Sequence, residues 1–140
     1  MQRLKTRPQF QAVLGGALIA KTDHFALHRV ELDAALTALG IALFPSMFPV
    51  KETWLGAMAP KRWAKRAVTR NAIKRQIYTV SASLEPLALP AAFLVRLRRE
   101  FSGKDYPSAS STVLKQAVRA ELLALLQTAG FLGQSTPEPV

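Results

Sequence analysis

Cysteine is absent from the sequence, so neither a disulfide framework nor a thiolate metal site can form. The chain holds two histidines, His24 and His28, which is too few for a histidine-rich metal site. A chain without cysteine fits a reducing compartment, and we expect a cytoplasmic protein.

Long apolar runs are also missing. The opening residues MQRLKTRPQF carry charges, but no apolar stretch of the signal-peptide kind follows them. The longest uncharged segment, 34–50, is slightly short for a membrane span and is broken by Gly40, Pro45 and Pro49. We expect buried or loop segments of a soluble domain there, with a membrane anchor as the alternative.

Acidic side chains are scarce, at nine against nineteen Lys and Arg. Asp23, Glu31 and Asp33 lie near one another in the sequence, but on different strand faces or in a turn, unlike the paired carboxylates of a two-metal nuclease. The serines have no base placed beside them by any motif. The sequence therefore offers no catalytic residues, no metal site and no small-molecule site.

The chain does carry a large positive charge, +10 at pH 7 with a pI near 10.7, which favours a polyanionic partner such as a nucleic acid. Much of this charge lies in the stretch PKRWAKRAVTRNAIKRQIY, which contains no acid. Its basic residues are Lys61, Arg62, Lys65, Arg66, Arg70, Lys74 and Arg75.

Hydrophobic periodicity predicts an α+β sandwich with helices packed on a small sheet, in the order α-β-β-(β)-α-β-α. The predicted elements are a helix from Pro8 to the pair Gly15–Gly16, a strand in DHFALHRVEL, a strand from Thr53, a helix at 68–84, a central strand in AAFLVRLRR and a helix at 111–128. Segment 34–50 is a further strand or the tail of a short helix. Residues 1–130 form one domain, and the polar tail 131–140 is predicted to be disordered.

Three apolar stripes give the expected core-facing sides of the helices. They are Phe10, Val13 and Leu14 in the first helix, Ile73, Ile77, Val80 and Leu84 in the second, and Val113, Ala117, Leu122, Leu125 and Leu126 in the last.

Arg70, Asn71, Lys74 and Arg75 form an arc directly beside the stripe of the second helix. Its first turns thus carry cations where the helix dipole is already positive, at a cost of a few tenths to ~1 kcal/mol each. A solvated helix face normally mixes Glu with Lys, and this arc does not. A bound phosphate would resolve the conflict. Phe10, Phe25 and His28 are candidates for stacking on unpaired bases, although Phe25 is more readily explained as core.

The stretch LGAMAPKRWAKRAVTRNAIKRQI, together with RLKTRPQFQAVL and HFALH, resembles the bacterial ribonuclease P protein component over about residues 3–130. The resemblance implies a left-handed βαβ crossover through the basic helix. It also implies a protein that binds a catalytic RNA, which cleaves the 5′ leader from precursor tRNA with Mg²⁺ bound mainly by the RNA. None of the catalytic groups would then belong to this chain.

The resemblance also assigns residues. Those facing the RNA subunit would be Lys65, Arg66, Arg70, Asn71, Lys74 and Arg75, and those lining the leader cleft would be Phe10, His28, Lys61 and Arg62. Leu14 and His28 stand where the family often has aromatic residues, which weakens a purely aromatic cleft.

Three other interpretations are open from the residues alone. The main one is a basic RNA-binding module of ribosomal or chaperone type without a nuclease. An autonomous nuclease lacks the necessary carboxylates, and a sequence-specific DNA-binding protein lacks helix-turn-helix spacing.

Overall fold

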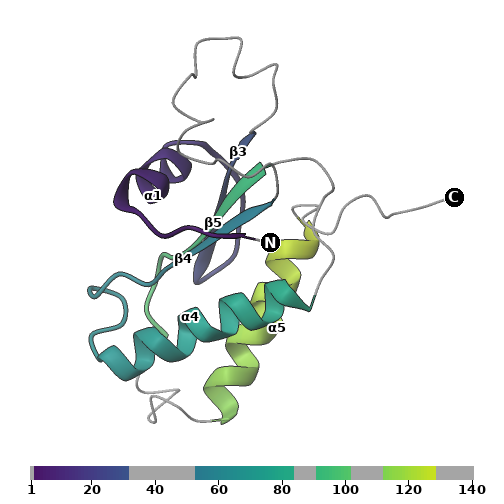
Figure 1. Ribbon diagram of the computed structural model, residues 1–140. Coiled ribbons are helices and arrows are strands. Elements are labelled where there is room, and N and C mark those ends of the chain that lie inside the picture. The colour runs from purple at the N-terminus through teal and green to yellow at the C-terminus, as the bar shows by residue number, and fades with distance from the viewer. Residues whose placement is uncertain (1, 32–52, 84–90, 102–111, 129–140) are drawn as a thin grey trace, which may run out of the picture.

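The computed structural model describes residues 2–31, 53–83, 91–101 and 112–128 (Figure 1). Along the chain, its elements are β1 (Gln2–Arg3), α1 (Arg7–Leu14), β2 (Ala17–Lys21), β3 (Phe25–Glu31), β4 (Trp54–Met58), α4 (Ala67–Ala82), β5 (Ala91–Leu97) and α5 (Thr112–Thr128). The predicted helices and strands in these ranges are confirmed, whereas β1 and β2 were not predicted. The interpretation of segment 34–50, of Leu84 at the end of the second helix stripe and of the tail 131–140 lies outside the described residues.

The strands form one mixed sheet in the order β1-β4-β5-β3-β2. The strands β4 and β5 are parallel neighbours connected through α4, whereas β3 is antiparallel to both β5 and β2. This arrangement confirms the α+β class and contains the βαβ unit that the resemblance implies, namely β4–α4–β5. The left hand of that unit stays a prediction.

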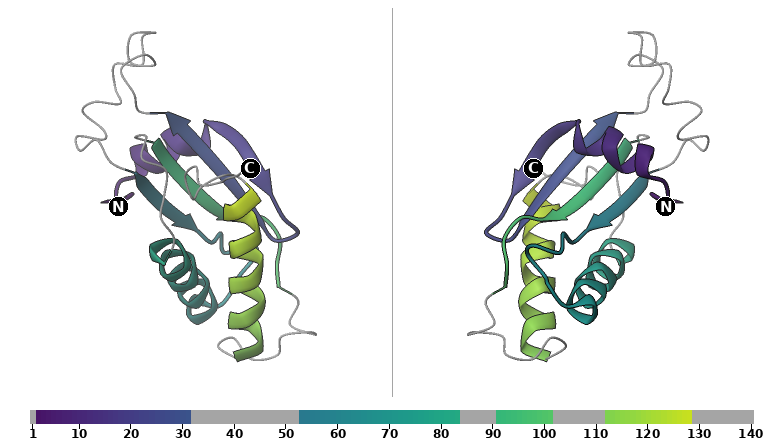
Figure 2. Two further views of the ribbon diagram at one scale, coloured as in Figure 1. Left: turned by 90° about the vertical axis from the view of Figure 1, so that its right-hand side faces the viewer. Right: turned by 90° about the vertical axis from the view of Figure 1, so that its left-hand side faces the viewer.

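Strand β5 lies at the centre of the sheet, as its apolar run predicts. Its residues from Ala91 to Val95 and Leu97 are buried, because helices cover both faces of the sheet. Figure 2 shows α1 on one side of the sheet and α4 with α5 on the other. The α4–α5 side holds the larger core cluster, which includes Ile73, Ile77, Val80 and Leu122.

Two stripe residues are not where the periodicity predicted them. Leu14 is 37% exposed and Val113 is 61% exposed, while Val13, Leu114 and Val118 are buried. The two outliers lie at the margin of their helix faces, beyond the width that each helix buries against the sheet. Periodicity identifies the apolar side of a helix, but packing decides how wide the buried part is.

Candidate nucleic-acid interface

The basic helix α4 begins after the turn 60–66. Its N-cap is Arg66, which makes no side-chain capping hydrogen bond, and no acid lies in the first turn. We call the residues Lys65, Arg66, Arg70, Asn71, Lys74 and Arg75 the basic arc. Of these, Lys65, Arg66, Asn71 and Arg75 are exposed, and Arg70 and Lys74 are half-buried. Most of the arc is therefore open to a partner.

Arg70 is already engaged within the protein. Its Nη1 donates hydrogen bonds to the backbone oxygens of Ala64, at 3.1 Å, and of Lys65, at 2.9 Å. The guanidinium therefore fastens the end of the turn 60–66 to the first turn of α4. This contact gives Arg70 a positioning role in the interface, which the sequence did not reveal.

Lys61 and Arg62 lie in the turn that follows β4. The turn is closed by hydrogen bonds from the backbone N–H groups of Trp63 and Ala64 to the Pro60 oxygen, at 3.0 and 3.1 Å. The Arg62 guanidinium lies 5.3 Å from the centre of the Trp63 ring. Both basic residues remain exposed, and the tight turn places them beside the start of α4.

Phe10 is positioned by the start of α1 and by a glycine on β4. Thr6 and Gln9 form a capping box, in which each side chain accepts a hydrogen bond from the other residue's backbone N–H. A Cβ on Gly56 would lie 2.9 Å from Cε1 of Phe10 and 2.5 Å from Cδ1 of Leu4. The missing side chain of Gly56 lets the half-buried Phe10 ring rest on the sheet.

His28 shares this side of the sheet with Phe10. The register aligns His28 with Leu94 and Leu94 with Gly56, so His28 lies two strands from Gly56, or roughly 10 Å. However, His28 is only 7% exposed, and Arg96 Nε donates a hydrogen bond to its Nε2 at 3.3 Å. The structure thus brings Phe10 and His28 onto one face, here called the α1 face, but it leaves the His28 ring covered.

Phe25 lies on the opposite side of β3 and is 0% exposed, so its interpretation as core is confirmed.

Burial, and secondarily the charge of Arg96, hold the pKa of His28 below the usual imidazole value of 6.5. As the pH falls below about 6.5, the unfolded chain takes up this proton more readily than the folded chain. The contribution of neutral His28 to stability is therefore complete above the unfolded pKa and is lost progressively below it.

We expect the urea midpoint to fall between pH 7 and pH 5.5, and to fall less in His28→Gln, which keeps an acceptor for Arg96. Equal pH dependence in both proteins would contradict this assignment.

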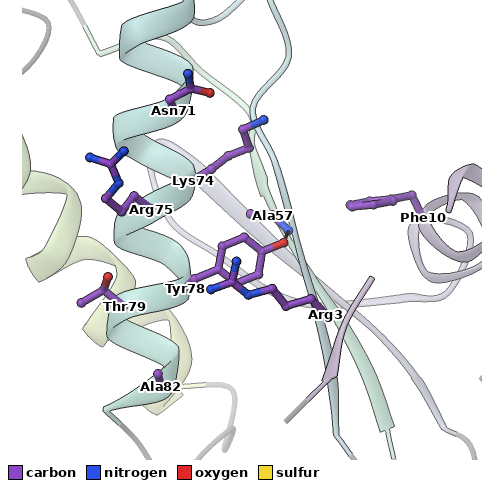
Figure 3. Close-up of a pocket in the computed structure, with 9 residues that line it drawn as sticks. All are labelled: Arg3, Phe10, Ala57, Asn71, Lys74, Arg75, Tyr78, Thr79 and Ala82. Atoms are coloured by element: carbon purple, nitrogen blue, oxygen red, sulfur yellow. Dashed lines mark hydrogen bonds between the residues drawn. The ribbon is translucent and has the colours of Figure 1, made fainter. Parts of the chain in front are cut away.

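Members of the two predicted sets meet in one cleft, although its lining does not include His28, Lys61, Arg62, Lys65, Arg66 or Arg70. A cavity of about 760 Å³ lies between α4 and the edge of β4, and it is lined by Phe10 together with Asn71, Lys74 and Arg75 (Figure 3). Its other lining residues are Arg3, Ala57, Tyr78, Thr79 and Ala82, and neither Arg3 nor Tyr78 was predicted as a site residue from the sequence. Tyr78 could have been noticed as an aromatic residue beside the Ile73 and Ile77 stripe, but the sequence has no comparable signal for Arg3.

Among the residues that the structure describes, no group of three or more His, Cys, Asp and Glu side chains could hold a metal ion. Within the same ranges, no helix is long and apolar enough to cross a membrane.

An α+β sandwich that gathers a basic arc, an apolar face and a cleft between them defines a protein of the nucleic-acid-binding class. The family model for ribonuclease P matches residues 1–121, and the chain belongs to the ribonuclease P protein family. Members of this family are the protein component of an endoribonuclease, so this chain has the subunit role in tRNA 5′ processing.

Individual relatives agree with this assignment. The ribonuclease P protein component of Ralstonia pickettii is 37% identical over 128 residues, covering 91% of this chain and 78% of the relative. That of Trichormus variabilis is 34% identical over 98 residues, covering 66% of this chain and 70% of the relative. The structure of the Staphylococcus aureus RNase P protein matches with a TM-score of 0.64 at 18% identity, covering 95% of this chain and 99% of that one, which supports the fold.

Proposed function

We propose that the basic arc binds the ribonuclease P RNA, and that the α1 face, together with Lys61 and Arg62, receives the single-stranded 5′ leader of precursor tRNA. The observation that carries this proposal is the cleft in which Phe10, from the leader set, meets Asn71, Lys74 and Arg75, from the RNA-subunit set. RNA that occupies this cleft would contact residues of both sets at once. In this proposal the complex works in the cytoplasm.

The chemistry of the two surfaces suits these two ligands. Exposed Lys and Arg side chains neutralise phosphates and release counterions, which favours a highly charged RNA without reading its sequence. A single strand also offers unstacked bases, which aromatic rings such as that of Phe10 can bind irrespective of sequence. Lys61 and Arg62, in the turn beside α4, would contact phosphates of the leader.

We assign Mg²⁺ to the RNA subunit, where it would supply the charge stabilisation and the activated water for phosphodiester hydrolysis. Mg²⁺ prefers carboxylate, phosphate and water oxygens. The basic arc offers it the amide oxygen of Asn71 and otherwise side chains of like charge. These residues do not fit a Mg²⁺ site of their own, so this chain would act on the metal only through the RNA that it positions.

Reconstitution tests the proposal. At low Mg²⁺, the purified chain should promote cleavage of precursor tRNA at the mature 5′ end only when ribonuclease P RNA is also present. Phe10→Ala should then weaken binding of the leader-bearing substrate about tenfold, the loss expected for one stacked base, without weakening that of tRNA lacking a leader.

Phe10→Leu serves as the control, because it keeps an apolar contact over Gly56 and removes the ring. It should lose leader binding to a similar extent while it folds normally. An equal loss with and without the leader would show that Phe10 only supports the fold. Cleavage that needs no RNA subunit would contradict the proposed division of labour.

A further inference from the structure

The cleft between α4 and β4 contains an aromatic ring with a cationic side chain stacked on it. Tyr78 projects from α4 toward β4, and its hydroxyl accepts a hydrogen bond from the backbone N–H of Ala57 at 3.2 Å (Figure 3). Strand β1 pairs with β4 only at Trp54 and Leu55, so Tyr78 satisfies an amide that lies beyond the end of this pairing. The ring is therefore held at the edge of the sheet.

Arg3 covers one face of this ring. Its guanidinium carbon lies 4.0 Å from the centre of the Tyr78 ring. The pairing of Arg3 with Leu55 fixes the backbone of Arg3, and Arg3 is exposed. In the described part of the chain, no carboxylate forms an ion pair with Arg3. A planar cation is thus held flat against a ring, with its donors available to a ligand.

The rest of the cleft provides phosphate-binding groups. Lys74 and Arg75 line it from α4, and Asn71 lies one turn nearer the start of that helix. Phe10 lines it from α1, on the other side of β4 from Tyr78 (Figure 3). A ligand that combines a flat ring with a phosphate matches this set, because guanidinium planes stack on bases and Lys and Arg bind phosphates.

We infer that this cleft is a subsite for one unpaired nucleotide of the leader, with its base stacked on the Arg3 guanidinium and its phosphate beside Lys74 and Arg75. These two cations would then lie between the leader phosphate and the RNA subunit and contact both. The inference rests on the proposed function, since it places this nucleotide where a strand lying over Phe10 crosses the edge of β4 toward α4. The stack would run from Tyr78 through Arg3 to the base. Tyr78 acts as a positioning residue, and Arg3 contacts the base.

Leader substrates that carry 2-aminopurine at one position at a time test the subsite in the reconstituted holoenzyme. Stacking quenches this base, so the unchanged protein should quench the leader position over Phe10 and one further position. Arg3→Gln and Arg3→Lys should lose the quenching at the further position only. The lysine keeps the charge but lacks the plane. We expect both variants to bind the leader-bearing substrate about fivefold to fiftyfold more weakly. Tyr78→Phe, which keeps the ring, should retain the quenching better than Tyr78→Leu.

Arg119→Gln is the matched control, because Arg119 is an exposed arginine on α5. It removes the same charge and should leave the quenching unchanged. Thermal unfolding of every variant identifies any that fail to fold, and Arg3→Lys keeps the test valid if Arg3→Gln is one of them.

Three distinguishable outcomes would overturn either the subsite or the proposed leader binding. If the Arg3 variants quench and bind like the unchanged protein, the contact with Tyr78 is structural and the subsite is wrong. If they lose affinity for the RNA subunit while leader quenching persists, the nucleotide belongs to that RNA and the inference is also wrong. If the unchanged protein quenches no leader position, the proposed leader binding itself fails.

Discussion

Replacing both Lys74 and Arg75 with alanine should weaken binding to ribonuclease P RNA about twentyfold at physiological salt. It should also lower the log–log salt slope of binding by roughly 1.4 to 1.8, the loss expected for two phosphate contacts. Filter binding or fluorescence titration across a range of salt concentrations measures both quantities. This expectation follows from the proposal that the basic arc faces the RNA.

The local structure explains why these two cations should have so large an effect. Both residues line the cleft from α4, and neither has an ion-pair partner among the residues that the structure describes. Their charge is therefore not neutralised within that part of the protein. Arg70 differs, because its Nη1 is already bonded to the oxygens of Ala64 and Lys65. Its replacement would disturb the turn 60–66 as well as remove a charge.

The matched control is the double variant Lys115→Ala and Arg119→Ala. Both residues are exposed on α5, and their removal changes the net charge by the same amount. We expect this control to bind RNA nearly as tightly as the unchanged protein, with a similar salt slope. If the two double variants lose affinity equally, only the overall charge matters and the basic arc has no special position.

Replacing Glu121 with alanine should destabilise the fold by about 2–4 kcal/mol, because it leaves partly buried donors without an acceptor. Glu121 Oε2 accepts hydrogen bonds from the Thr22 hydroxyl and from the backbone N–H of His24, the latter at 2.6 Å. Its Oε1 lies 2.8 Å from Nδ1 of His24. The carboxylate thus ties the β2–β3 turn to α5. Urea unfolding measures the loss.

Neighbouring contacts make this turn dependent on α5 and on the end of β5. The His24 ring stacks on Phe101, with centroids 3.9 Å apart and an interplanar angle of 11°. Arg98 Nη1 donates to the backbone oxygens of Thr22 and Asp23, at 2.8 and 3.0 Å. Without Glu121 these contacts would have to hold the turn alone, and β2 is an edge strand with few other neighbours.

Glu100→Ala is the control for this experiment, since Glu100 is exposed and its replacement removes the same charge. Its free energy of unfolding should stay within about 0.5 kcal/mol of the unchanged protein. Glu121→Gln should fall between the two, because it keeps one acceptor oxygen but loses the charge. The salt slope of RNA binding should not change in folded Glu121→Ala. A midpoint equal to that of Glu100→Ala would show that the turn does not depend on this carboxylate.

Features with a local signal could be predicted from the sequence alone. The stripe Ile73, Ile77 and Val80 identified α4, and the apolar run of β5 identified a central strand, because burial on one or both faces leaves a pattern within a single segment. The basic arc and the resemblance carried by the same stretch were equally visible. Charge on a helix surface needs no partner elsewhere in the chain to be recognised.

Features that depend on residues far apart in the chain became visible in the folded structure. Strand β1 has two residues and exists because Gln2 and Arg3 pair with Trp54 and Leu55, and β2 shows no buried alternation of its own. The Arg3–Tyr78 stack and the contact of Glu121 with His24, 97 residues apart, have no local pattern. Strand pairing and side-chain contacts over such separations are fixed by how the whole core packs, which no single segment records.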